Sequence, residues 1–356
     1  MKIAIVLPSL HQSGPGIQMR NLIYPLIKLG VKIEVFYLKV ETGQTLDFEG
    51  VRCQQINIWN LKKQFSKFDI IHSNGFFPDL ISAIIRLKCK EIKNVTTLHN
   101  FIHEDFAKRY GVIKGNVFSL LWFCILRFVP NKIVFTEVAK QYYSDRTSGN
   151  LYVLGSGVPV ADIIELKNNT DSICNEAVEK IINIKSNDFK IIGSTAVVTK
   201  VKGLDIVIRS LVILNDHVAI FVGGGKEEKS LIDLSKELGV SDRVVFLGFQ
   251  KNPIYYMRFF DAYAMTSISE SFGLSLFEAI ACKVPVVCNK LPVFEELLNE
   301  NVVHFYDGTP ESFVFQIKQS YQENFSGKAY DHLMEHYDVI VVGNKYYKLY
   351  SELLSK

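Results

Sequence analysis

Short apolar runs alternate along this chain with segments whose hydrophobic residues recur at helical spacing. The first run, residues 2–8 (KIAIVLP), is rich in β-branched residues and predicts a buried strand. A loop with Gly14, Pro15 and Gly16 follows, and hydrophobic positions from 17 to 27 then predict a helix that ends at Gly30. Residues 31–38 (VKIEVFYL) are the next expected strand. This order of strand, glycine loop, helix and strand opens a sheet of the nucleotide-binding type.

The same alternation continues and, after an interruption, begins again. Further strands are expected in the first half at residues 68–75, 93–100 and 131–137. A turn-rich and charged crossover follows at residues 155–190. Beyond it, strands are expected at residues 189–197, 217–225, 242–249, 259–267 and 284–290. Helices are expected at 205–214, 229–239 and 273–282, and a final one at 337–354 that could run back to the first half. We therefore predict an α/β fold with two Rossmann-like domains facing a central cleft, residues 1–160 and 161–336, followed by a C-terminal helix at 337–356.

Length and composition agree with this prediction and exclude some classes of protein. A chain of 356 residues suits about two domains of ~150 residues, and 48% apolar against 22% charged residues excludes disorder. Mean hydropathy is +0.14, but the longest apolar run, 117–126, is stopped by Arg127 and is shorter than the ~18 residues of a spanning helix. The N-terminal apolar stretch is cut by Pro8 and is too short for a signal peptide. Six cysteines without metal-like spacing indicate reduced thiols within the protein core and a cytoplasmic protein.

The net charge of +3 is unevenly distributed between the two halves. Residues 1–160 carry 20 Lys and Arg against 11 Asp and Glu, a net charge of +9, whereas residues 161–356 carry 20 against 26, a net charge of −6. A membrane surface, a nucleic acid or a phosphorylated substrate would suit the basic half, and scatter without function is the alternative. The basic residues form no stripe with interleaved aromatics, so a nucleic acid is the least favoured partner.

Residues 269–279 (SESFGLSLFEA) carry the most informative chemistry. Glu270 is expected to end a strand, and Phe272, Gly273 and Leu274 to turn into a helix that carries Glu278 on its second turn. Free N–H groups at a helix N-terminus bind phosphate, and Glu278 could then reach neighbouring ribose hydroxyls. The alternative is that Gly273 only makes a turn and Glu278 is an ordinary residue of a helix surface.

This segment resembles the signature of retaining glycosyltransferase family 4, which has the GT-B fold and includes enzymes of bacterial surface-polysaccharide assembly. The family pattern E-x7-E with F-G-[LV] inside is matched by Glu270, residues 272–274 and Glu278, and the following A-x-G-x-P-V-V by residues 281–287, with Lys283 in place of Gly. The segments KGLDIVIRSL, VGGGKEEKSL and LGF resemble further family motifs in the right order. In the first half, DIIHSNG, VTTLHN and IVFTE resemble the family's strand ends, so the resemblance covers nearly the whole chain.

The resemblance implies roles for individual residues. Lys202 would contact the donor diphosphate, together with the N–H groups around Phe272, Gly273 and Leu274. Glu278 would bind the ribose, Glu270 would bind the donor sugar, and Gly248 and Phe249 would border the base. His99 would contact either a distal hydroxyl of the donor sugar or the reacting centre. Gly16 would let the backbone of the first domain approach the reacting phosphate. The sites implied as catalytic are thus Lys202, Glu270 and His99.

The sequence also departs from the family pattern. The family usually has an Arg five residues before the Lys of K-G, whereas this chain has Val197, and Lys200 is a candidate substitute cation. The usual N-terminal Gly-Gly is Pro15-Gly16, and the Gly pair expected after V-P-V-V is replaced by residues 289–291 (NKL). These changes bear on the identity of the donor sugar and on the level of activity.

No metal or resident cofactor is expected. His99 and His103 are four residues apart, but no third ligand is evident, and neither a dinucleotide fingerprint nor a G-x-x-x-x-G-K-[ST] loop is present. Residues 108–132 place Lys108, Arg109, Lys114, Arg127 and Lys132 around an apolar stretch with Trp122. That composition suits a helix lying in a membrane interface, and a buried helix of the first domain is the alternative.

Together these features predict a metal-independent, retaining, hexosyltransferase-type glycosyltransferase. Its donor would be a nucleotide-diphosphate sugar, UDP-linked in preference to GDP-linked, and its acceptor a saccharide, which a polyprenyl diphosphate could carry. It would act in the cytoplasm, with peripheral contact to an anionic membrane surface, in O-antigen, capsule or related polysaccharide assembly. The alternatives are a non-catalytic GT-B partner subunit and a sugar-nucleotide epimerase.

Overall fold

The chain forms two compact units. The computed structural model describes residues 1–11, 13–40, 45–171 and 173–356. Unit 1 comprises Met1–Gly157 and Tyr337–Lys356, and unit 2 comprises Val158–His336. The predicted boundaries were residues 160 and 336.

Unit 1 is built on a seven-stranded sheet in which all neighbouring strands are parallel, in the order β3-β2-β1-β4-β5-β6-β7. Its strands are β1 (Lys2–Ser9), β2 (Lys32–Lys39), β3 (Arg52–Gln55), β4 (Ile70–Ser73), β5 (Lys93–Thr97), β6 (Asn131–Val134) and β7 (Asn150–Val153). Its helices are α1 (Gly14–Lys28), α2 (Leu61–Phe65), α3 (Phe76–Lys88), α4 (Ile102–Tyr110), α5 (Val112–Leu126), α6 (Glu137–Ser144) and α16 (Val339–Ser355). The inner residues of β1 are fully buried, as expected for a parallel strand covered on both faces.

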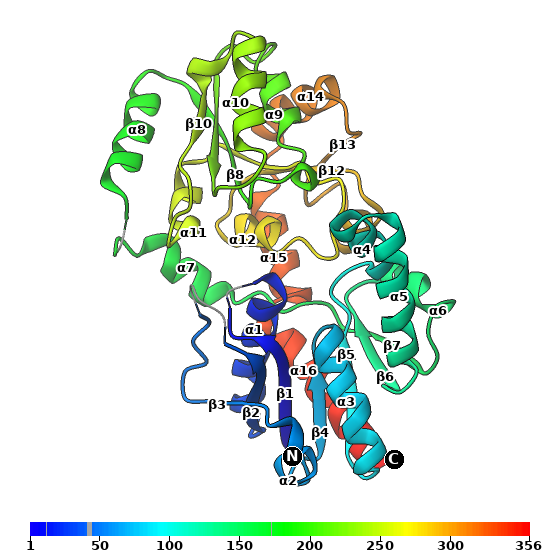
Figure 1. Ribbon diagram of the computed structural model, residues 1–356. Helices are drawn as coiled ribbons and strands as arrows, with labels where there is room; N and C mark the ends of the chain where they lie inside the picture. The colour runs from blue at the N-terminus through cyan, green and yellow to red at the C-terminus, as the bar shows by residue number, and fades with distance from the viewer. Residues whose placement is uncertain (12, 41–44, 172) are drawn as a thin grey trace. The chain divides into compact units, whose positions relative to one another are not determined.

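The C-terminal helix α16 belongs to unit 1 and is the red helix beside its sheet in Figure 1. Tyr346 and Tyr350 of this helix are buried in the same core as the apolar side of α1. The two helices approach closely at Gly343, where a Cβ atom would lie 2.6 Å from the Pro25 ring. Glycine at this position therefore lets α16 pack on α1.

Unit 2 is built on a six-stranded parallel sheet in the order β10-β9-β8-β11-β12-β13. Its strands are β8 (Lys190–Thr195), β9 (His217–Val222), β10 (Val244–Phe246), β11 (Ala262–Met265), β12 (Val286–Asn289) and β13 (His304–Tyr306). Its helices are α7 (Val160–Asn168), α8 (Asn175–Ser186), α9 (Asp205–Ser210), α10 (Glu228–Glu237), α11 (Pro253–Tyr256), α12 (Leu274–Ala281), α13 (Pro292–Leu297), α14 (Pro310–Gln322) and α15 (Ser326–His336). The strand order reverses between β8 and β11, the place where ligands bind in Rossmann-type sheets.

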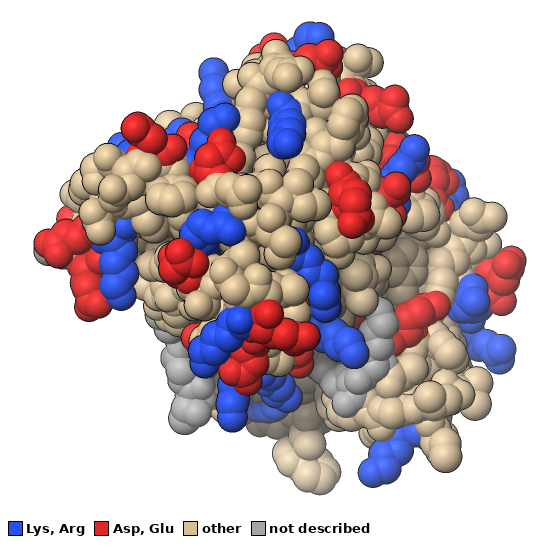
Figure 2. Space-filling model, turned by 90° about the horizontal axis from the view of Figure 1, so that it is seen from above, with Lys and Arg blue, Asp and Glu red and all other residues tan. Residues whose placement is uncertain are grey.

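The prediction of an α/β fold with two Rossmann-like domains is confirmed. The sequence pattern missed the edge strands β3, β7 and β13, and it treated α7 and α8 as an irregular crossover. All six cysteines are free, but only Cys282 and Cys288 are buried, so the expectation of six core thiols was wrong. On the face seen in Figure 2, basic and acidic side chains are interspersed and no basic stripe is visible.

Candidate active site

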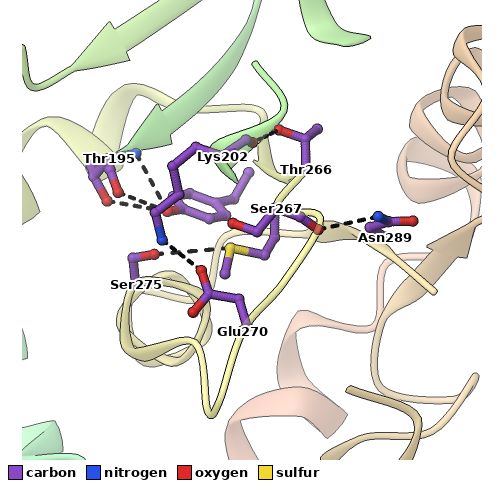
Figure 3. A network of polar contacts seen from close by, with 9 residues as sticks. Thr195, Lys202, Thr266, Ser267, Glu270, Ser275 and Asn289 are labelled. Atoms are coloured by element: carbon purple, nitrogen blue, oxygen red, sulfur yellow. Dashed lines mark hydrogen bonds and ion pairs between the residues drawn. The ribbon is translucent and has the colours of Figure 1, made fainter. Parts of the chain in front are cut away.

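The family signature lies in the loop between β11 and α12 of unit 2. β11 ends at Met265, so Glu270 lies within the loop and not at the end of the strand, as the sequence suggested. The strand stops there because the next residues bond outside the sheet. The Ile268 N–H donates to the Val201 carbonyl at 2.9 Å, and the Asn289 amide donates to the Ser267 carbonyl at 3.1 Å. Figure 3 shows the bond between Ser267 and Asn289. Both bonds fasten the loop beside the carboxyl ends of the strands.

Lys202 and Glu270 form an ion pair at this loop. The Lys202 Nζ lies 2.5 Å from the Glu270 Oε1, and both side chains are largely buried, with 27% and 14% of their surfaces exposed. The two residues are 68 positions apart in the sequence, and Figure 3 shows their side chains pointing toward each other. The structure therefore brings together two of the residues that the sequence analysis assigned to the donor.

The turn that carries Lys202 is fixed by glycine and by a threonine of the loop. Lys202 ends a short 3₁₀ turn, Lys200–Lys202, and Gly203 follows with a φ of +58°. A Cβ atom at Gly203 would lie 2.3 Å from the Thr266 carbonyl oxygen, so only glycine fits without a shift of the backbone. The Thr266 hydroxyl donates to the Lys202 carbonyl at 2.7 Å. The Lys202-Gly203 pair thus fixes the backbone position from which the Lys202 side chain extends.

Gly273 is the residue before α12, and the first N–H groups of that helix adjoin the loop. Gly273 has a φ of +81°, and a Cβ there would lie 2.7 Å from the Phe294 ring. Leu274 and Ser275 are the first residues of the helix, where no preceding turn supplies carbonyl acceptors for their N–H groups. Phe272 is fully buried and stacks on Phe277 with ring centroids 4.6 Å apart. Phe272 thus anchors the turn through its side chain, and only its backbone is available to a ligand.

Glu278 lies on the second turn of α12, as predicted. Burial raises the pKa of its carboxyl group to about 7. Within the described parts of the chain, its carboxylate has no hydrogen-bond or ion-pair partner. A half-buried acid without a protein partner is available to hydrogen-bond donors of a ligand.

The residues predicted to border the base and to replace the missing cation also lie in unit 2. Gly248, with a φ of +64°, accepts a hydrogen bond of 2.8 Å from the Gly223 N–H, and the next residue, Phe249, has 70% of its surface exposed. Val197 is exposed as well. Lys200 is exposed and borders a cavity of about 500 Å³ that Asp205 and other charged residues of α9 and α10 line. The substitution of Lys200 for the usual Arg stays a prediction.

Gly16 and His99 lie in unit 1. Gly16 is in the first turn of α1, where the Ser13 hydroxyl accepts its N–H, and a Cβ atom there would lie 2.6 Å from the Leu46 side chain. His99 follows β5 and is buried, with its Nδ1 hydrogen-bonded to the Gln18 side chain. Burial lowers the pKa of His99 to about 3, so its ring stays neutral at physiological pH.

Several supporting residues carried no signal in the sequence. Thr266 and Asn289 hold the signature loop, and the Tyr263 hydroxyl bonds to Thr195 beneath it. Each of these contacts joins segments that only the folded sheet brings together. Among the described residues, no group of three or more His, Cys, Asp or Glu side chains is placed to hold a metal ion.

The chain is similar in sequence and in fold to known glycosyltransferases. Residues 176–336 match the family model described as glycosyl transferases group 1. An O-antigen biosynthesis glycosyltransferase of Escherichia coli, WclY, is 31% identical over 360 residues, which cover 99% of each chain. The structure of Anabaena Alr3699/HepE in complex with UDP has a TM-score of 0.80 at 18% identity and covers 99% of this chain and 100% of that one. WaaG, a glycosyltransferase involved in lipopolysaccharide biosynthesis, has a TM-score of 0.71 at 13% identity, with 98% and 99% covered.

The solved structures are too distant in sequence to show more than the fold. That fold matches the fold of this chain over almost the whole length of each structure. The relative in E. coli is similar enough, over 99% of each chain, to show the family. The chain therefore belongs to the glycosyl transferases group 1 family and is a glycosyltransferase with the GT-B fold.

Proposed function

We propose that this protein is a retaining glycosyltransferase of family 4 that uses a UDP-sugar to extend a bacterial surface polysaccharide. Two similarities support the choice of donor and product. The relative WclY is named for O-antigen biosynthesis, and the Anabaena HepE structures hold UDP, or UDP-glucose. The acceptor in this proposal is a saccharide carried on a polyprenyl diphosphate.

The observation that carries the proposal is the cluster of Lys202, the N-terminus of α12 and Glu278 in unit 2. The first N–H groups of α12 suit a diphosphate, and Glu278 lies one turn further along the same helix, within reach of an adjoining ribose. The Lys202 ammonium, already directed to this loop by Glu270, would neutralise the charge that develops on the leaving diphosphate. These groups supply the positive charge that a metal ion supplies in other transferases, so we propose that none is required.

The chemistry that fits this cluster proceeds on one face of the sugar. The bond between the anomeric carbon and the diphosphate oxygen breaks, and an acceptor hydroxyl bonds to the same carbon from the same side. The acceptor proton passes to the leaving phosphate oxygen, so no protein base is needed. Glu270 is paired with Lys202 and would position the sugar rather than take the proton.

A surface of unit 1 supports contact with a membrane. Helix α5 buries Gly115, Ser119 and Leu126, and most of its apolar side chains are exposed to solvent. The alternative prediction, a buried helix of the first domain, was therefore wrong for most of the helix surface. Its most exposed members include Ile113, at 82%, and Leu120, at 65%. A contiguous exposed apolar face of this kind marks an interaction site.

The charges around this helix differ in part from the prediction. Lys114 and Arg127 are exposed, but Lys132 is fully buried in β6, where its ammonium donates to the carbonyls of Val129 and Ser148 at 2.7 and 2.5 Å. Trp122 turns inward and donates its indole N–H to Asp79 at 2.7 Å. The side chains of Lys108 and Arg109 lie outside the described part of the structure.

We propose that the exposed face of α5 lies in the interface of an anionic membrane, where the lipid carrier of the acceptor resides. Among the residues that the structure describes, none of the helices has both the length and the apolar composition needed to cross a bilayer. The protein would therefore bind the surface peripherally, through α5 with Lys114 and Arg127 at the lipid headgroups.

One experiment tests the transfer reaction directly. The purified protein is incubated with single UDP- and GDP-sugars and a set of polyprenyl-diphosphate-linked saccharides, without added metal and with EDTA, and the product linkage is determined by NMR. The proposal predicts transfer from a UDP-sugar with the anomeric configuration of the donor. An inverted linkage would refute retention, and activity only after metal is restored would refute metal independence.

A further inference from the structure

Gln18, on α1 of unit 1, has no role in the motifs that identify the family, but it makes the hydrogen bond that orients His99. The Gln18 side-chain oxygen faces the Nδ1 atom of the His99 ring. The His99 and Phe135 rings also contact each other edge to face, with centroids 5.2 Å apart and planes at 67°. The ring is therefore held on two sides, by one polar and one apolar contact.

The second ring nitrogen of His99 is buried and unsatisfied. Within the described residues, Nε2 has neither a hydrogen-bond partner nor appreciable exposed surface. A neutral imidazole carries one proton, and the hydrogen bond at one nitrogen decides which nitrogen holds it. Because an amide oxygen can only accept, the proton resides on Nδ1, and Nε2 presents a lone pair.

A cavity of about 10 Å³ adjoins this ring, which is the room that a single oxygen atom of a water or hydroxyl needs. Gln18, Thr97, His99, Ser156 and Tyr346 are its polar lining residues. Since Gln18 occupies Nδ1, Nε2 is the nitrogen of His99 that remains available to an oxygen in this cavity.

The C-terminal helix closes the cavity on another side. Tyr346 of α16 lines it, and Tyr350, one turn further on, bonds to His72 Nδ1 at 2.6 Å. His72 Nε2 in turn bonds to the Thr97 hydroxyl at 2.7 Å. Burial lowers the pKa of His72 to about 3 and raises the pKa of Tyr346, so neither neighbour changes charge between pH 5 and 9.

We propose that Gln18 is a positioning residue that fixes the Nδ1-protonated tautomer of His99 and thereby makes Nε2 an acceptor for one hydroxyl group. In the free protein that group is a water molecule, and during transfer it is a hydroxyl of a bound sugar. The part that concerns transfer rests on the proposed function, whereas the tautomer and the water site do not.

The first test is spectroscopic and needs no substrate. The ¹⁵N shifts of the ring are recorded in the wild type and in Gln18→Met, with His99→Phe to assign the signals. Gln141→Met, an exposed glutamine of α6, is the control. The proposal predicts a protonated Nδ1 and an unprotonated Nε2 in the wild type and the control. In Gln18→Met it predicts loss of this single tautomer. A wild-type ring protonated on Nε2, or an unchanged tautomer in Gln18→Met, would overturn it.

The second test separates positioning from stability through a pH profile. In Gln18→Glu, a carboxylate beside Nδ1–H stabilises the doubly protonated ring and raises its pKa, so Nε2 would be lost as an acceptor on acidification. We expect kcat to fall about tenfold or more below the new pKa, with a melting temperature close to that of the wild type. Gln18→Met should lower kcat about tenfold at every pH. Identical pH profiles for wild type and Gln18→Glu would contradict participation of Nε2 in transfer.

A third measurement, crystal structures of the free protein and of its donor and acceptor complexes, distinguishes the sources of the hydroxyl group. A water resolved at Nε2 in a crystal structure and displaced by a sugar hydroxyl in the donor or acceptor complex is the expected result. A water that stays in place in those complexes would limit Gln18 and His99 to a structural role. Absence of any transfer, with the expected tautomer intact, would refute the proposed function and leave the tautomer assignment standing.

Discussion

The carboxyl group of Glu278 should make nucleotide binding depend on pH. Burial raises its pKa to about 7, whereas an ordinary glutamate has a pKa of 4.5. A carboxylate accepts hydrogen bonds from ribose hydroxyls more strongly than a carboxylic acid does. Binding of UDP should therefore favour the ionised form, and the free protein must lose a proton to bind at acidic pH.

The size of this effect follows from the shifted pKa. Below the pKa, each pH unit lowers the ionised fraction about tenfold, so the apparent Kd for UDP should rise by up to about tenfold between pH 8 and pH 6. Because burial raises the pKa of this carboxyl group, the affinity for UDP should increase as the pH rises through about 7. Glu278→Gln removes the titration, weakens UDP binding at pH 8, and keeps the size of the side chain.

The assay is isothermal titration of UDP into both proteins at pH 6, 7 and 8. Phosphate groups of UDP also titrate in this range, but they do so equally for the two proteins, so the ratio of the two Kd values isolates Glu278. We expect the Kd of Glu278→Gln divided by the Kd of the wild type to increase with pH and to level off above pH 8. A ratio that is constant from pH 6 to 8 would refute the contact between Glu278 and the ribose.

Three further predictions concern other residues. Lys202→Ala should lower kcat by about a hundredfold or more, because it removes the cation beside the leaving diphosphate, and unchanged turnover would exclude that role. Gly273→Ala should destabilise the protein by about 1–3 kcal/mol, measured by urea unfolding, because of its φ of +81° and the contact with Phe294. Gly327→Ala, in open space on α15, is its control and should be neutral, whereas equal effects would contradict the strain argument. The pair of substitutions Ile113→Asn and Leu120→Asn should abolish sedimentation with anionic vesicles at low salt while leaving UDP binding intact, and wild-type protein that stays in the supernatant would contradict membrane contact.

Much of the fold was predictable because parallel strands buried on both faces leave a continuous apolar signal. β1 and β9 are such strands, and their runs stand out from the amphipathic helices around them. The edge strands β3 and β7 gave no such signal, since their residues are only partly buried and include polar side chains such as Gln55 and Asn150.

The candidate site was predictable where backbone geometry restricts the residue type. Gly203 and Gly273 both have positive φ, and both contact atoms that leave no room for a side chain. The bond between Gln18 and His99 and the burial of Lys132 depend instead on contacts between distant segments, which spacing along the chain does not reveal. Lys132 shows the limit most clearly, because a lysine that follows an asparagine at the start of an apolar run is usually exposed.

Binding of a nucleoside diphosphate to unit 2 is the central claim, and a thermal-shift screen tests it most directly. UDP, GDP, ADP and CMP are each added to the wild type, to Lys202→Ala and to Glu278→Gln. A ligand at a hundred times its Kd stabilises the native state by about 2.7 kcal/mol, which gives a clear shift of Tm. The account predicts a shift of the wild type with UDP above all others and a much smaller one in both variants. No shift of the wild type with any nucleotide, or an equal UDP shift in all three proteins, would contradict it.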